Sequence, residues 1–243
     1  MTHLTFIAGG SKGLGAAMVE SFQTNNHTVY EFSRTGELPL HIDCDFGIPS
    51  QAKTVFDTTF QTHSKQTYQS VNLLINTAVL APFGSLSLAS NHQISTHLAV
   101  NIDSTILLIQ AFLKAFENSP ITKSLAYISS GAARRAIPGL AMYSASKAFF
   151  ERLINTIAEE QKSASHPFKC MVINPGVMNT DMQNEIRSQS EENFPMVGMW
   201  NDLHKNGQLA APKDIAAVCT ELVTKSGVNG GHYVAQQLIP SNS

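Results

Sequence analysis

Two residue types that can move protons stand one helical turn apart in this sequence. Lys147 follows Tyr143 by four positions, the only Tyr-x-x-x-Lys among the five tyrosines, and residues four apart lie on one face of a helix. A cation beside a phenol favours the phenolate and lowers its pKa below the usual value of about 10. Such a tyrosine exchanges a proton with a carbonyl or alcohol oxygen near neutral pH. Taken alone, the pair also fits an exposed helical tyrosine with a lysine one turn on.

A glycine-rich turn follows the first predicted strand, residues 4–8. Its glycines are Gly9, Gly13 and Gly15, in G-x-x-x-G-x-G rather than G-x-G-x-x-G spacing, and a helical pattern follows them. Glycines let the backbone turn tightly and approach a pyrophosphate, which the helix N-terminus attracts. The turn therefore predicts a dinucleotide site, with a plain strand-to-helix turn as the alternative.

The second predicted strand ends without the acidic residue that holds the ribose of NAD. Ser33 and Arg34 stand there instead, and Lys12 supplies a second cation from the glycine turn. A hydroxyl and two cations suit the 2′-phosphate of NADP, so these residues favour NADP over NAD. A solvated loop arginine is the alternative interpretation of Arg34.

Strand and helix patterns alternate along the whole chain. Strands are predicted at residues 4–8, 28–32, 38–46, 71–75, 124–128, 169–173 and 231–234, and the later helices at 51–63, 88–116, 143–162 and 212–224. Residues 65–70 read as a polar loop and 177–207 as irregular. This alternation predicts one α/β domain over residues 1–243, a Rossmann-like three-layer sandwich with a parallel sheet of about seven strands.

Composition excludes several classes of function. The 243 residues carry a net charge of −2 from 16 basic and 18 acidic side chains without a basic stripe, so we expect no nucleic-acid partner. Three widely spaced cysteines without a C-x-x-C pair argue against disulfides or a metal site and fit the cytoplasm. The N-terminus has no signal-peptide pattern, and no apolar run approaches the roughly 18 residues of a membrane span.

These motifs, in this order, resemble the short-chain dehydrogenase/reductase family over residues 4–234. The family's serine lies 13 positions before its tyrosine, which identifies Ser130 rather than Ser129. The resemblance implies the catalytic set Asn101, Ser130, Tyr143 and Lys147. It implies that NADP(H) contacts Gly9, Ser11, Lys12, Gly13, Leu14, Gly15, Ser33, Arg34, Asp45, Phe46, Asn76, Ala78, Tyr143, Lys147, Pro175, Gly176, Val177 and Thr180.

The resemblance also implies a role for each catalytic residue. The cofactor gives hydride to a carbonyl carbon, Tyr143 gives a proton to its oxygen, and Ser130 orients that oxygen. Lys147 lowers the pKa of the tyrosine and contacts the nicotinamide ribose, and Asn101 holds a water that replenishes the proton. Val79 departs from the family, which has glycine there; a β-branched residue disfavours positive φ, so we expect a different loop path and altered cofactor affinity.

The substrate is indicated less directly. Residues 175–183 resemble a segment of sepiapterin reductases and of bacterial benzil reductases, and residues 188–207 resemble the benzil reductase branch. Phe194, Met196, Met199 and Trp200 are predicted to form an apolar lid without a fixed cation. This suits small uncharged ketones, aromatic ones included, or 1,2-diketones.

Three alternatives remain open at this stage. The first is a pterin carbonyl reductase of the sepiapterin reductase type, with Asp181 holding the pterin ring. The second is an NADP-binding sensor without turnover, supported by Val79, and the third is a structural interaction domain. Family members associate through the helices that carry Asn101 and Tyr143, so we expect a homodimer or homotetramer with a small-molecule substrate and no membrane partner.

Overall fold

A parallel sheet forms the centre of the molecule. The structure, a computed structural model, describes residues 2–37 and 39–240. Outside the described residues lie Met1, Leu38 and residues 241–243. The third strand was predicted to begin at Leu38. Within these ranges seven strands pair in the order β3-β2-β1-β4-β5-β6-β7, all parallel. The strands are β1 Thr2–Ala8, β2 His27–Ser33, β3 His41–Asp43, β4 Tyr68–Ile75, β5 Thr122–Ile128, β6 Lys169–Asn174 and β7 Gly231–Val234.

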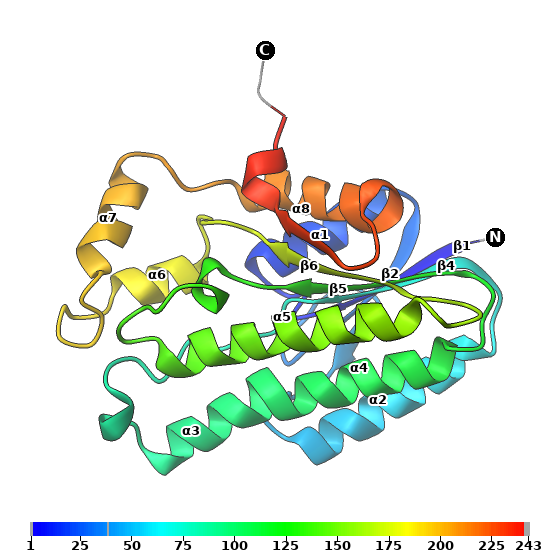
Figure 1. Ribbon diagram of the computed structural model, residues 1–243, viewed down its shortest axis with the longest axis horizontal. Helices are drawn as coiled ribbons and strands as arrows, with labels where there is room; N and C mark the ends of the chain where they lie inside the picture. Colours follow the sequence, from blue (N-terminus) through cyan, green and yellow to red (C-terminus); the bar gives the residue numbers. More distant parts are fainter. Residues whose placement is uncertain (1, 38, 241–243) are drawn as a thin grey trace.

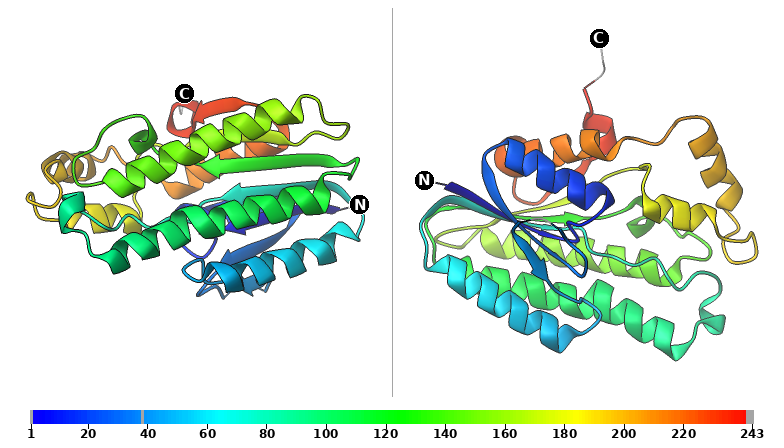
Figure 2. Two further views of the ribbon diagram at one scale, coloured as in Figure 1. Left: turned by 60° about the horizontal axis from the view of Figure 1, so that its bottom comes forward. Right: turned by 180° about the vertical axis from the view of Figure 1, so that it is seen from behind.

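Helices cover both faces of the sheet, which confirms the predicted Rossmann-like three-layer fold (Figures 1 and 2). On one face lie α2 (Pro49–Ser64), α4 (Ser104–Phe116) and α5 (Ala141–Gln161), and on the other α1 (Gly13–Thr24) and α8 (Pro212–Glu221). Successive side chains of a strand point to opposite faces. Phe6 of β1 accordingly packs in the core beneath α2 and α4, and its neighbour Ile7 in the core beneath α1 and α8.

The strand order reverses between β1 and β4, which places a crevice at the carboxyl ends of these strands. In open α/β sheets ligands bind at such a switch point. The loops after β1, β2, β4, β5 and β6 all emerge at this edge. In Figure 1 it is the end at which α6 (Asp181–Arg187) and α7 (Val197–Lys205) project beyond the sheet.

Several predicted segments differ from the structure. β3 spans only His41–Asp43 rather than residues 38–46, because this edge strand pairs with β2 alone, over three residues. β4 starts at Tyr68, inside the predicted polar loop, because Tyr68 pairs with Thr2 and its hydroxyl is bonded to His63. The region 177–207 holds the helices α6 and α7 rather than irregular chain, and contacts of Phe194 and its neighbours with the core fix both.

The helical run predicted at 88–116 begins at Asn91 and contains a wider turn. Ser90 and Gln93 cap α3 (Asn91–Leu98) reciprocally, and a π-helical turn, Ala99–Asp103, joins it to α4. By length and composition the run Asn91–Phe116 is apolar enough to cross a membrane, contrary to the expectation from sequence. In this fold Leu108, Phe112 and Phe116 of the run are buried in the core beneath the sheet.

Candidate active site

A cavity of about 300 Å³ opens at the carboxyl edge of the sheet. Six of the predicted site residues line it: Ser130, Tyr143, Pro175, Gly176, Val177 and Thr180. They come from the loop after β5, from α5 and from the segment after β6. Lys147 and Asn101 are buried as well, so the structure brings together residues that are distant in sequence.

Tyr143 and Lys147 lie on the buried face of α5. The Lys147 Nζ donates a hydrogen bond to the Ile128 carbonyl at 2.8 Å and lies 4.8 Å from the centre of the Tyr127 ring and 5.6 Å from that of Tyr143. Burial lowers the pKa of Lys147 to about 7.

The pKa of Tyr143 is shifted in the direction opposite to the prediction from sequence. Burial raises it to about 12, against a smaller lowering by the hydrogen bond with Ser130. Desolvation of the phenolate outweighs the effect of a lysine that itself loses its charge near neutral pH. The Tyr143 hydroxyl therefore keeps its proton at neutral pH, as a proton donor requires.

Two adjacent serines at the end of β5 have different partners. The Ser130 Oγ accepts a hydrogen bond from the Ala132 N–H at 3.1 Å, at the start of a short 3-10 turn, Gly131–Ala133. Ser129 is buried and its Oγ donates to Glu151 at 2.7 Å. Ser130 lines the cavity with Tyr143 and lowers the pKa of that tyrosine, whereas Ser129 anchors the loop from behind.

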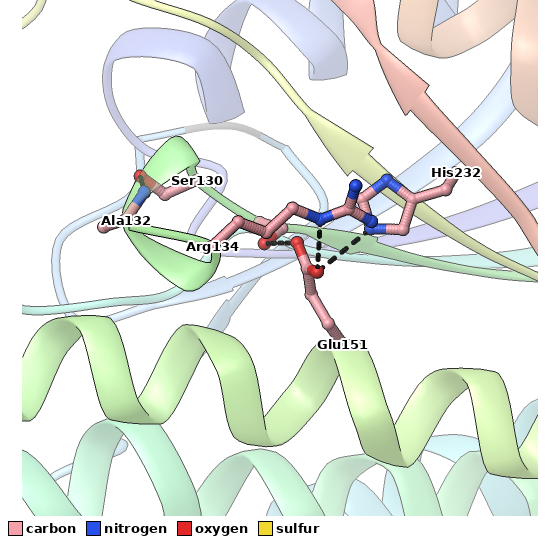
Figure 3. A network of polar contacts seen from close by, with 6 residues as sticks. Ser130, Ala132, Arg134, Glu151 and His232 are labelled. Carbon is pink, nitrogen blue, oxygen red and sulfur yellow. Dashed lines mark hydrogen bonds and ion pairs between the residues drawn. The ribbon is translucent and has the colours of Figure 1, made fainter. Parts of the chain in front are cut away.

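Glu151, one helical turn after Lys147 on α5, gathers a polar network behind the cavity (Figure 3). Its carboxylate accepts hydrogen bonds from Ser129 and from the Arg134 Nε at 3.0 Å, and the His232 Nε2 of β7 lies 3.1 Å away. Burial raises the pKa of Glu151, but these three partners together lower it below its ordinary value. The network ties the Ser130 loop to α5 and β7, and sequence reasoning missed it.

Asn101 holds the loop that follows β4. Its side chain accepts a hydrogen bond from the Val79 N–H and donates to the Val79 carbonyl, both at 2.8 Å. The Asn101 Nδ2 also lies 3.0 Å from the Nε2 of the buried His97, whose Nδ1 contacts the Ala81 carbonyl at 2.7 Å. Within the described residues only Asn26 has a positive φ among non-glycines, so the loop accommodates Val79 without strain.

The turn after β1 fits a dinucleotide phosphate. Gly9 and Gly13 have φ of +78° and +51°, and a Cβ on Gly15 would lie 1.8 Å from the Gly9 carbonyl oxygen. No side chain caps the start of α1, so the N–H groups of its first turn are available to an anion. Asn76 supports the turn by donating to the Gly9 carbonyl at 3.2 Å.

Of the two cations predicted for the 2′-phosphate, Arg34 directly follows β2 and Lys12 lies in the turn after β1. Arg34 and Lys12 are both exposed. Ser33 is half-buried and its Oγ donates to Glu31 at 3.2 Å. Glu31 is 1% exposed and also contacts His41. This buried acid lies two residues before Ser33, a position that sequence reasoning did not consider.

Other predicted cofactor residues are placed mainly by their backbones. Leu14 is buried in the core beneath α1, and Phe46 packs against Phe56 in the opposite core. Asp45 accepts a hydrogen bond from the Gly47 N–H at 2.7 Å. Ser11 and Ala78 are half-buried, on the turns after β1 and β4.

The segment after β6 closes the site on the side opposite the glycine turn. Gly176 has a φ of +82°, and a Cβ there would lie 2.2 Å from the Gln236 Oε1. That same oxygen accepts a hydrogen bond from the Val177 N–H at 3.1 Å. Thr180 faces the glycine turn, its Cγ2 3.4 Å from the place of a Cβ on Gly13. Gln236 was missed because no motif surrounds it.

The wall of the cavity differs from the predicted lid. Trp200 lines the cavity, whereas Phe194 is fully buried beneath it and Met199 is 44% exposed. One cation, the exposed Arg135, also lines the cavity and packs against Gly131, a residue that sequence reasoning did not place there. The remaining apolar lining residues are Leu80, Ala132, Ile137, Leu140, Met178, Met182, Ile186 and Val234.

Fold and site together define an oxidoreductase class. A family model described as short chain dehydrogenase matches residues 3–191. The chain belongs to the short-chain dehydrogenase/reductase family, whose members use nicotinamide cofactors.

Individual relatives agree with this assignment. The chain is 30% identical to a benzil reductase ((S)-benzoin forming) of Bacillus subtilis, over 98% of this chain and 100% of the relative. It is 26% identical to the sepiapterin reductase of Bos taurus, over 67% and 60% of the two chains. A crystal structure of a short-chain dehydrogenase/reductase from Saccharomyces cerevisiae shares the fold with a TM-score of 0.81 and 22% identity, over 98% of this chain and 100% of that one.

Proposed function

We propose that this protein is an NADPH-dependent carbonyl reductase for small uncharged ketones or 1,2-diketones. The observation that carries the proposal is the placement of Tyr143 and Ser130 together in a cavity with a largely apolar wall beside the glycine turn. The benzil reductase named above, which matches over nearly the full length of both chains, supports the diketone class.

The residues have separate roles in this reaction. NADPH, when bound, would supply hydride to the carbonyl carbon. Tyr143 gives its proton to the carbonyl oxygen, and Ser130 hydrogen-bonds the same oxygen, so developing negative charge meets two positioned donors. Lys147, with a pKa of about 7, is suited to return a proton to Tyr143. Asn101 keeps the loop of Val79 in place.

The choice of NADPH rests on Arg34 and Lys12. Both cations are exposed beside the glycine turn, where neither is needed for the core. A charge-assisted hydrogen bond contributes about 1.5–3 kcal/mol. Arg34→Glu is therefore expected to weaken NADPH binding by about tenfold to a hundredfold and to spare NADH, while Arg152→Glu, an exposed arginine on α5, leaves both unchanged.

The test follows oxidation of NADPH with benzil, with NADH in parallel and Tyr143→Phe as the control. Turnover that prefers NADPH and disappears in Tyr143→Phe supports the proposal. Binding of NADPH without turnover on benzil, simple ketones and pterins would instead indicate a sensor. Sepiapterin reductases remain a second candidate class because one of them is a relative; however, Asp181 is exposed and is not among the residues that line the cavity.

A further inference from the structure

Gln183 on α6 is a buried amide that faces the substrate cavity without a protein partner. Its side chain is 3% exposed, and it lines the same cavity as Ser130 and Tyr143. Among the described residues, neither its Nε2 nor its Oε1 has a hydrogen-bond partner. Buried polar groups are almost always paired, and each unpaired one weakens folding substantially. We therefore expect a ligand in the cavity to form a hydrogen bond with the Gln183 amide.

A second unpartnered donor lines the same cavity. The Trp200 Nε1 of α7 is buried and has no hydrogen-bond partner in the part of the chain that the structure describes. Met182 and Ile186, which share α6 with Gln183, contribute apolar lining to the cavity. The wall contributed by α6 and α7 therefore offers two N–H donors within an apolar surface, which suits a neutral carbonyl oxygen because such an oxygen has two lone pairs.

We propose that Gln183 binds the second oxygen of a 1,2-dicarbonyl substrate and so determines specificity for that class. The reacting carbonyl is held by Ser130 and Tyr143, and the Gln183 Nε2 donates to the adjacent carbonyl. A monoketone of the same shape leaves the amide unpaired in an apolar wall, which is unfavourable. The inference rests on the proposed function, because the reacting carbonyl is positioned by the groups assigned there.

An uncharged oxygen is favoured over a carboxylate at this position. Gln183 is buried in the wall and carries no charge, and burying an anion against a neutral amide costs more than burying a carbonyl. Arg135 lines the cavity but is an exposed residue. The chemistry of Gln183 therefore suits a neutral oxygen rather than an anion.

The test compares benzil with 1,2-diphenylethanone, which lacks one of the two carbonyl oxygens. Trp200 is the only tryptophan in the sequence and lines the cavity, so quenching of its fluorescence reports binding without turnover. Dissociation constants are measured with NADP⁺ present and absent, for the wild type, Gln183→Met and Gln183→Leu. Gln189→Met, a glutamine that follows α6 and does not line the cavity, is the matched control, and circular dichroism verifies that each variant is folded.

We expect the wild type and Gln189→Met to bind benzil about tenfold to a hundredfold more tightly than the monoketone. In both Gln183 variants this ratio falls to within about threefold. An unchanged ratio in the folded Gln183 variants, or a wild type without preference for benzil, overturns the inference. If the ratio falls as expected but no variant transfers hydride to any carbonyl, the proposed function fails and the binding role of Gln183 stands.

Discussion

Replacing Lys147 by methionine should make the folded protein more stable near neutral pH while abolishing its reductase activity. The lysine is 3% exposed, and burial lowers its pKa from 10.5 to about 7. A lowered lysine pKa means that the folded state binds fewer protons than the unfolded state, so the folded state is penalised wherever the unfolded lysine is charged. The penalty is complete below pH 7, shrinks as the pH rises and vanishes above pH 10.5.

The magnitude follows from these pKa values. Each pKa unit corresponds to 1.36 kcal/mol, so the penalty on the wild type is about 4 kcal/mol at pH 7 and about 2 kcal/mol at pH 9. Methionine has no charge, and its packing does not depend on pH. The stability gap between Lys147→Met and the wild type should therefore shrink by about 2 kcal/mol between pH 7 and pH 9.

The titratable groups around Lys147 do not account for a change in the stability gap between pH 7 and pH 9. Tyr143 and Tyr127 face Lys147 and have raised pKa values, and burial lowers the pKa of His97 below its ordinary 6.5. Urea unfolding of the cofactor-free protein, followed by far-ultraviolet circular dichroism at both pH values, measures the gap. Lys213→Met, at an exposed position of α8, should show no such change. A gap that is equal at pH 7 and pH 9 would refute the reasoning.

Two further predictions concern the supports of the site. Gly15→Ala should destabilise the fold by about 1–3 kcal/mol and weaken NADPH binding, because its Cβ would lie 1.8 Å from the Gly9 carbonyl oxygen. Thermal unfolding and cofactor fluorescence measure these two effects. The control Gly198→Ala, whose Cβ meets nothing within 4 Å among the described residues, should match the wild type. Glu151→Gln should lower the unfolding free energy by about 2 kcal/mol at pH 7 and reduce kcat. The pKa of Glu151 lies below its ordinary 4.5, so its carboxylate stabilises the fold above pH 4.5, and this stabilisation is lost as the pH falls through the pKa of the folded state. Urea unfolding of Glu151→Gln and the wild type at pH 7 and pH 3 tests this, with Glu159→Gln as the exposed control. An equal decrease in unfolding free energy at both pH values would contradict it.

The sequence predicted the elements that repeat a strong pattern. β1, the glycine turn and α1 follow from an apolar strand, three spaced glycines and a helical face, and the sheet follows from their alternation with the later elements. β3 was placed poorly because an edge strand of three residues, His41–Asp43, leaves almost no periodicity. The helices α6 and α7 were missed because they are short and depend on contacts with residues far away in the chain, such as Leu80 and Leu140.

The sequence predicted which residues belong to the site but not how deeply they are buried or which groups surround them. Spacing placed Tyr143 and Lys147 on one helix face, but the direction of the tyrosine pKa depends on burial, which the other elements create. Gln183, Gln236 and Glu151 belong to no motif. Their roles emerge only when loops from different strands meet, and no local signal in the sequence distinguishes them from surface glutamines and glutamates.

The route of the chain through the site also governs when a newly made molecule becomes competent. The glycine turn is complete by residue 15, yet the turn at Gly176 needs the Gln236 side chain, and the anchor at Glu151 needs His232. Both partners follow every predicted catalytic residue in the chain. A chain that stops before residue 232 has every predicted catalytic residue and lacks these two contacts, so synthesis must pass residue 236 before the site is assembled.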